Sequence, residues 1–165
     1  MSRRRLRDRA AILVIIAAAL TTVATSPPFF LLEDEAVIEL TATDIRTFHI
    51  VLTPEAVEET LWSSITVSAT GELDRYEQLL VAPADERLDS VDLAELAREP
   101  TPGAEARHRY HIDASELCPP AQLCELAFTL EAEGEGEIQL GIRAALEREQ
   151  SDFSDAARVE ILVDE

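Results

Sequence analysis

Lysine is absent from this chain, so arginine supplies all 14 basic residues, against 33 acidic ones. The formal net charge is −19 at pH 7. Proteins bind nucleic acids and anionic lipid headgroups by neutralising negative charge, which this composition disfavours. We therefore expect no nucleic-acid partner. The charge instead suits a protein partner with a basic surface, divalent cations or a salty medium.

Aromatic residues and catalytic signatures are also scarce. Aromatic residues make up 5% of the chain, with a single tryptophan, which leaves little material for a sugar-stacking cleft. We expect Trp62 and Tyr110 in the core or at its edge. The motifs G-x-S-x-G and H-E-x-x-H and a glycine-rich phosphate loop are missing. These absences disfavour an enzyme, although a carboxylate pair for glycoside hydrolysis is defined in space and escapes a sequence search.

The N-terminus has the composition of an export segment. Residues 1–9 contain five arginines, and the next eleven residues, 10–20, are apolar throughout. A basic stretch followed by a short apolar run is typical of a secretory signal peptide. Small residues end at Ala24, which places the expected cleavage after this residue. Cleavage there would remove five arginines and one aspartate and change the net charge from −19 to −23.

The same segment also fits a retained membrane anchor. No charge interrupts Ala10 to Leu32, a run long enough at about 1.5 Å per residue to cross a bilayer of about 30 Å. Pro27 and Pro28 shorten the uninterrupted helix. We interpret residues 1–32 as a signal peptide or an N-terminal anchor. The protein is then periplasmic or extracellular if cleaved, and otherwise membrane-anchored through this segment alone, with its C-terminal domain outside.

Residues 33–165 are predicted to form one acidic domain. Period-two alternation of apolar and polar residues dominates after residue 35, as in strands with one buried face. One wet face for each strand and regularly spaced turns favour an all-β, mainly antiparallel β-sandwich of seven or eight strands with one or two short helices. A small β-barrel is the alternative. The expected strands lie at 36–42, 47–52, 65–69, 78–81, 107–112, 126–131, 137–143 and 159–163.

Two connections in this pattern are predicted in more detail. A short turn joins the first two strands, and the glycines near residue 135 indicate a hairpin between the runs at 126–131 and 137–143. Thr53 and Pro54 indicate the start of a short helix with Val57 and Leu61 on one face. Residues 83–105 are expected to form an insertion at one end of the sheet, with a short helix at 91–98.

Cys118 and Cys124 are predicted to form a disulfide, because an exported chain meets an oxidising compartment and two prolines tighten the loop between them. Together with His108 and His111 they would also match a set of zinc ligands. Residues three apart on a strand point to opposite faces, however, and oxidised thiols bind no metal. We therefore expect a structural disulfide and no metal site here.

Acidic clusters raise the question of calcium. The clusters are Glu33–Glu35, then Asp85, Asp89 and Asp92, and finally Asp152 with Asp155. None has the ligand spacing of a preorganised calcium loop. We expect solvated carboxylates and no cofactor, with calcium as the secondary candidate.

The sequence thus predicts a non-catalytic domain of the cell envelope with a binding or structural role. One alternative is a secreted hydrolase or metal-dependent enzyme, whose sign would be His108 or His111 beside a serine and an acid in one pocket. Another is a cation-dependent adhesion or assembly module.

Overall fold

The computed structural model describes residues 29–98, 105–149 and 151–164. Strands dominate, with four short helical segments between them. In chain order the elements are β1 (Phe29–Thr41), β2 (Ile45–Leu52), α2 (Pro54–Glu59), β3 (Trp62–Gly71), the 3-10 helix η1 (Leu73–Arg75), β4 (Tyr76–Pro83), β5 (Val91–Asp92), α3 (Leu93–Arg98), β6 (Glu105–Ile112), α4 (Ala114–Leu117), β7 (Cys124–Gly134), β8 (Glu137–Glu149) and β9 (Val159–Val163).

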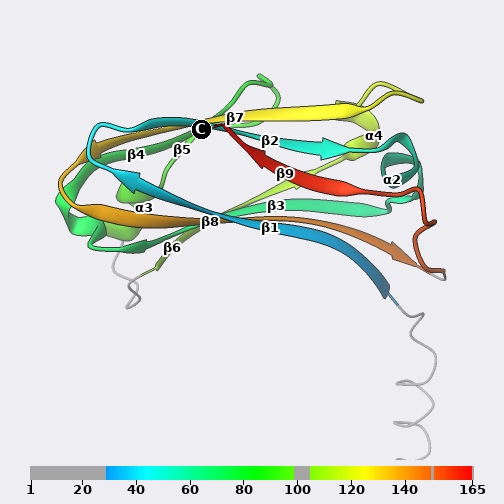
Figure 1. Ribbon diagram of the computed structural model, residues 1–165, viewed down its shortest axis with the longest axis horizontal. Coiled ribbons are helices and arrows are strands. Elements are labelled where there is room, and N and C mark those ends of the chain that lie inside the picture. The colour runs from blue at the N-terminus through cyan, green and yellow to red at the C-terminus, as the bar shows by residue number, and fades with distance from the viewer. Residues whose placement is uncertain (1–28, 99–104, 150, 165) are drawn as a thin grey trace, which may run out of the picture.

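The strands form two stacked antiparallel sheets (Figure 1). One has four strands in the order β1-β8-β3-β6, and the other has five in the order β5-β4-β7-β2-β9. The predicted all-β sandwich is therefore confirmed, with nine strands where seven or eight were expected. The additional strand is β5, which lies where the start of a helix was predicted. Ladders join strands within each sheet, and none among the described residues joins the two sheets, so the barrel alternative does not hold.

The alternating residues meet between the sheets and form the core. Leu40 of β1, Val67 of β3 and Leu130 of β7 are fully buried. The rings of Phe48 in β2 and Phe128 in β7 stack with their centroids 4.8 Å apart. Burying each large apolar side chain contributes about 1.5–3 kcal/mol, so the shared core holds the two sheets together.

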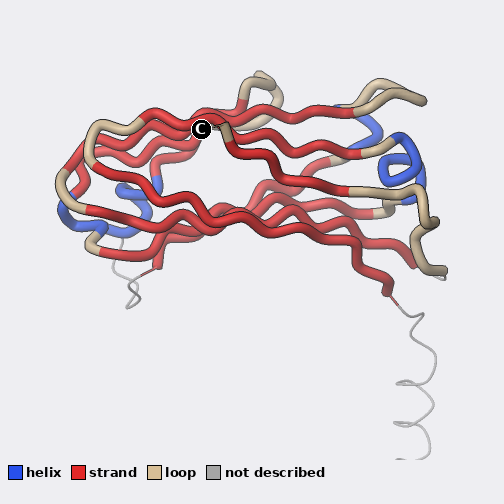
Figure 2. The backbone as a smooth tube through the Cα atoms, viewed as in Figure 1, coloured by secondary structure: helices blue, strands red, loops and turns tan. Residues whose placement is uncertain are grey.

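The predicted hairpin at residues 126–143 is wrong. Its two strands exist as β7 and β8, but β7 pairs with β2 and β4, and β8 pairs with β1 and β3. The same applies to β1 and β2, which lie in different sheets (Figure 2). Alternation of apolar and polar residues indicates only that one face of a strand is buried. Two strands that pair within a sheet and two strands that face each other across a core both have one buried face, so the pattern does not distinguish them. Among the consecutive strands that the structure describes, β4 and β5 alone pair directly.

Three of these crossings meet at one end of the sandwich, which we call the crossover end. It contains the turns between β1 and β2, between β3 and β4, and between β7 and β8. The Tyr76 hydroxyl donates to the Gly136 carbonyl (2.8 Å), and the Glu135 amide donates to the Arg75 carbonyl (3.1 Å). These bonds hold the turn between β3 and β4 against the turn between β7 and β8.

The helices partly match prediction. Thr53 caps α2 by accepting from the Ala56 amide, and Val57 is buried as expected. Leu61 lies beyond the helix and is exposed. Within the expected insertion, α3 packs Leu93 into the core, and the remaining residues 99–104 lie outside the described ones. Helix α4 was not predicted.

The boundary with the N-terminal segment also differs from expectation. Strand β1 begins at Phe29, so residues 29–32 pair with residues 146–149 of β8 instead of belonging to the leader. Residues 1–28, including the expected cleavage point after Ala24, lie outside the described residues. In the part of the chain that is described, no helix is long and apolar enough to cross a membrane.

Candidate functional site

The outer face of the four-stranded sheet carries two adjoining hollows. The larger, of about 470 Å³, is lined by Trp62, Ser64 and His111 among others, and we call it the Trp62 hollow. The smaller, of about 250 Å³, is lined by Thr66 and Arg143 among others, and we call it the Arg143 hollow. Arg109 lines both. The hollows therefore form one continuous candidate binding surface centred on Arg109.

Cross-strand register creates these hollows. Short side chains on the outer face of β3 stand beside long ones on its neighbours: Ser64 opposes His111, and Thr66 opposes both Arg109 and Arg143. On β8 the outer face is also low, because Gly141 has no side chain. Long side chains that surround short ones leave open space on the sheet surface, which can hold water or a ligand.

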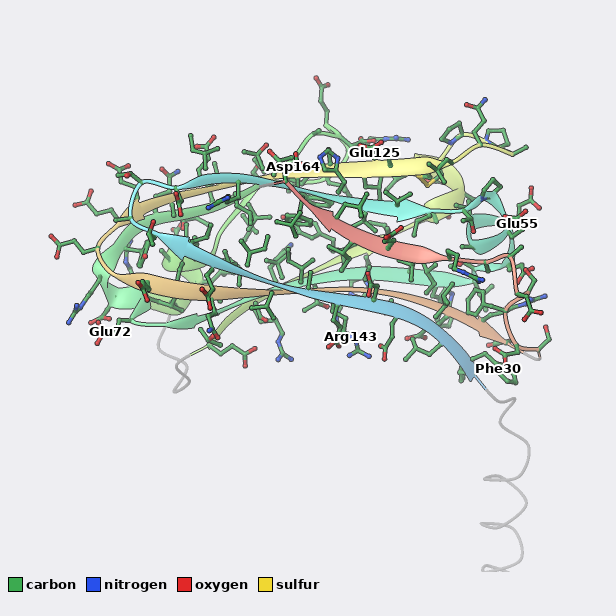
Figure 3. All side chains as sticks on the ribbon, viewed as in Figure 1. Phe30, Glu55, Glu72, Glu125, Arg143 and Asp164 are labelled. Atoms are coloured by element: carbon green, nitrogen blue, oxygen red, sulfur yellow. A yellow bond between two sulfur atoms is a disulfide. The ribbon has the colours of Figure 1, made fainter. Side chains whose placement is uncertain are left out.

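Two arginines on this surface are paired with carboxylates. Arg143 donates from Nε to Glu33 (2.9 Å) and lies 3.2 Å from Glu35, and Arg107 binds Glu105 (2.8 Å). In Figure 3 Arg143 stands on the outer side of the sheet, away from the core.

Arg109 differs from both of these arginines. Its Nε donates to the Thr66 hydroxyl (3.3 Å), and no carboxylate among the described residues pairs with it. Its guanidinium is therefore the positive group of this face that an incoming anion would find unneutralised.

Trp62 lies on this surface and not in the core, so the prediction for this residue was wrong. Its side chain is 57% exposed, and its ring lies 6.4 Å from that of Phe29. Extending the inward alternation of Ile65 and Val67 back along β3 would have placed Trp62 outside. Tyr110 is buried, as predicted.

The polar residues expected of a hydrolase meet only in part. Ser64, His111 and Asp113 all line the Trp62 hollow. The Asp113 carboxylate accepts from the backbone amide and hydroxyl of Ser115 and so caps α4. Among the described residues His111 forms no hydrogen bond with the serine or the aspartate. A nucleophile needs contact with its base, and the base needs an orienting group.

The cysteine prediction is confirmed. Cys118 and Cys124 form a disulfide with their Cα atoms 5.2 Å apart. Strand β6 places His111 on its exposed face, whereas His108 lies on the inner side with its ring edge-on to Tyr110. Burial lowers the pKa of His108. The zinc set is therefore not assembled, for the geometric reason given above.

The acidic clusters are largely engaged in structural contacts. Asp85 pairs with Arg87, whose hydrogen bonds lower the pKa of this carboxyl to about 2. Asp92 accepts from the amides of Leu79 and Ala94. Across residues 29–98, 105–149 and 151–164, no group of three or more His, Cys, Asp or Glu side chains is placed to hold a metal ion, and this includes Asp85, Asp89 and Asp92.

Sequence reasoning missed a charged contact on the other sheet. His49 of β2 lies between two carboxylates, with Nδ1 2.7 Å from Glu125 of β7 and Nε2 3.1 Å from Asp164 after β9. The contact with Glu125 is close but not aligned as a hydrogen bond. Glu125 lies on one neighbour of β2 and Asp164 directly follows the other, so only the register could have revealed them. Figure 3 shows Glu125 and Asp164 on the outer side of the five-stranded sheet.

No protein-family model matches the chain, and no curated protein is detectably similar to it in sequence. Function must therefore be argued from the site alone.

Proposed function

We propose that this protein is a non-catalytic binding domain of the cell envelope that contacts its ligand with the outer face of the four-stranded sheet. The observation that carries the proposal is the position of Arg109. It lines both hollows and has no carboxylate partner among the described residues, although the chain as a whole is strongly acidic. An uncompensated guanidinium in a hollow is a ready partner for a carboxylate or similar group.

The surroundings narrow the class of ligand. Ser64, Thr66 and His111 offer further hydrogen-bonding groups, whereas Glu35 and Glu147 line the same surface and repel dense negative charge. A ligand with one anionic group on a polar, uncharged body fits this combination, and a polyanion does not. Recognition would then depend on one charged contact surrounded by neutral ones.

The single tryptophan provides the test, because Trp62 lines the hollow and reports its occupancy by fluorescence. We expect acetate and glucuronate to change Trp62 emission in the full chain. The R109A variant should bind these probes more weakly by roughly ten- to a hundredfold, since a hydrogen bond to a charged group contributes about 1.5–3 kcal/mol.

R75A is the matched control, because Arg75 pairs with Glu72 at the crossover end. It should bind like the unchanged chain. An unchanged titration in R109A, or no response of the parent chain to either probe, would remove the assigned ligand class.

Export is the second part of the proposal. The composition of residues 1–32 supports it, and so does the Cys118–Cys124 disulfide, because such bonds persist in oxidising compartments. Fractionation of the host with protease treatment of intact cells tests it. The domain should be accessible to protease from outside the cytoplasmic membrane. Recovery of the chain inside the cytosol with both thiols reduced would contradict the proposed export.

A secreted hydrolase is the second candidate, favoured by the shared hollow of Ser64 and His111. An active serine would react with a fluorophosphonate probe, and S64A would abolish the labelling. We expect no labelling, because no hydrogen bond joins this serine and histidine among the described residues.

A further inference from the structure

An exposed apolar cluster lies at the end of the sandwich opposite the crossover end. It consists of Phe29, Leu31, Leu61 and Trp62, and we call it the apolar corner. Each of these side chains is roughly half exposed: 54%, 48%, 52% and 57%, respectively. Soluble proteins scatter exposed apolar residues singly, so a cluster of four including two large aromatics indicates a contact surface.

Register explains how residues from different strands meet here. Leu31 of β1 and Trp62 of β3 both lie opposite Glu147 of the intervening strand β8. Phe29 lies two residues before Leu31, and its ring reaches to within 6.4 Å of the Trp62 ring. The apolar residues of the corner therefore come from β1 and from the start of β3, and Glu147 of β8 lies between Leu31 and Trp62.

The position of the corner in the chain indicates which kind of surface it contacts. Strand β1 begins at Phe29, immediately after a stretch, residues 10–28, that has no charged side chain. Phe30, labelled in Figure 3, stands at this end of β1. Eight uncharged residues separate the apolar run at 10–20 from the corner, four of them threonine or serine and two of them proline. A leader held in a membrane would therefore keep this end of the domain nearest to the bilayer.

The chemistry of the corner matches that of a membrane surface. Tryptophan and other aromatic side chains concentrate where the hydrocarbon of a bilayer meets the headgroups. Glu147 lies between Leu31 and Trp62, Glu149 lies opposite Phe29, and Asp113 lines the adjoining hollow, so the charged groups around the corner are mostly acidic. Such surroundings tolerate zwitterionic headgroups and repel anionic ones.

We infer that residues 10–28 are retained as a membrane anchor and that the apolar corner rests in the headgroup region of a zwitterionic bilayer outside the cytoplasm. This inference rests on the proposed export. It also orients the domain, because the strands then run away from the membrane. Thr66, four residues beyond Trp62 on β3, lies about 13 Å further out. Arg109 and Arg143, which lie opposite Thr66, therefore stay in water, and the ligand titration with Trp62 is made without vesicles.

The test uses Trp62 as a depth probe in the full chain, reconstituted in phosphatidylcholine vesicles whose acyl chains carry bromine near the headgroup. Bromine quenches tryptophan on contact. We expect a blue shift of the Trp62 emission and loss of most of its intensity relative to vesicles without bromine. The double change F29S/L31S should restore part of the intensity, with an unchanged circular dichroism spectrum because both side chains are exposed.

The matched control moves the reporter to the other end of the molecule. Ile45 is 68% exposed at the crossover end, and residues 137–147 of β8 separate the two ends by about 33 Å. The W62F/I45W variant should show no quenching in the same vesicles. Equal quenching in both chains, no quenching in either, or a native chain that begins at Thr25 would each overturn the inference. Protease accessibility of the domain in intact cells would still decide the proposed export separately.

Discussion

At the scale of single residues, Gly134 of β7 shows how closely its backbone approaches that of the neighbouring strand β4, where Tyr76 is its partner and the register shifts. A Cβ atom at this position would lie 2.6 Å from the Tyr76 Cα and 2.8 Å from the Arg75 carbonyl oxygen. Both are backbone atoms and have little freedom to move. The sequence pattern predicted this glycine as part of a hairpin turn, but it is required because the backbone of β4 lies against it at the register shift.

This close approach leads to a prediction for G134A. We expect it to lower the free energy of unfolding by about 1–3 kcal/mol, as overpacking of a rigid site does. Urea denaturation measures the change. G141A is the control, because its Cβ would meet the movable Ser68 hydroxyl at 3.0 Å, and it should be nearly neutral. Equal effects of the two substitutions would contradict the assigned packing.

The ion pair between Asp85 and Arg87 leads us to predict that the stability of the fold depends on pH. Arg87 lowers the folded-state pKa of Asp85 to about 2 from the ordinary 3.8, and the same arginine donates to the Glu116 carbonyl, which joins this turn to α4. Because the folded pKa is the lower one, the contact stabilises the fold above about pH 4 and is lost as the pH falls towards 2.

The D85N variant should therefore be less stable than the parent chain at pH 7, and most of this difference should be gone near pH 2. Urea midpoints at the two pH values measure this. E72Q serves as control, because the Glu72–Arg75 pair is exposed and contributes little. A D85N difference that persists undiminished at pH 2 would show that the ion pair is not its cause.

At the scale of elements, every strand run expected from alternation is present, yet most partners differ from the simplest expectation. Local periodicity records which residues face the core, and Ile38, Phe128 and Ile142 all do. Pairing depends on where each turn directs the chain, and the turns between β1 and β2 and between β7 and β8 cross to the opposite sheet. The candidate site shares this limit, since Arg109 and Trp62 meet through register alone.

Removing the disulfide measures how much one such connection, the loop between α4 and β7, contributes to the stability of the fold. Closing a loop with five residues between the two cysteines lowers the entropy of the unfolded chain by an amount that corresponds to about 2 kcal/mol. We expect C118S/C124S to lose about this much stability by urea denaturation. Reductant should destabilise the parent chain similarly and leave the double variant unchanged. A further effect of reductant on the variant would contradict this account.

At the scale of the whole molecule, the net charge of −19 predicts self-repulsion in the folded state. Raising sodium chloride from about 0.01 M to about 1 M shortens the screening length from about 30 Å to about 3 Å. The melting temperature should rise over this range. A fall would contradict the prediction.

Calcium at the same ionic strength separates screening from specific binding. We expect no additional rise, because no metal-binding group is found within the described ranges. An additional rise at millimolar calcium would favour the cation-dependent adhesion or assembly module over the proposed binding domain.

The sequence by itself determined the class of fold, the strand runs and the disulfide, because each depends on local signals: a period of two, turn residues and two cysteines in a short loop. The tertiary structure decided which strands pair, that Trp62 lies outside, and that Arg109 stands between two hollows. These features depend on the register between strands distant in the chain, which no local pattern records.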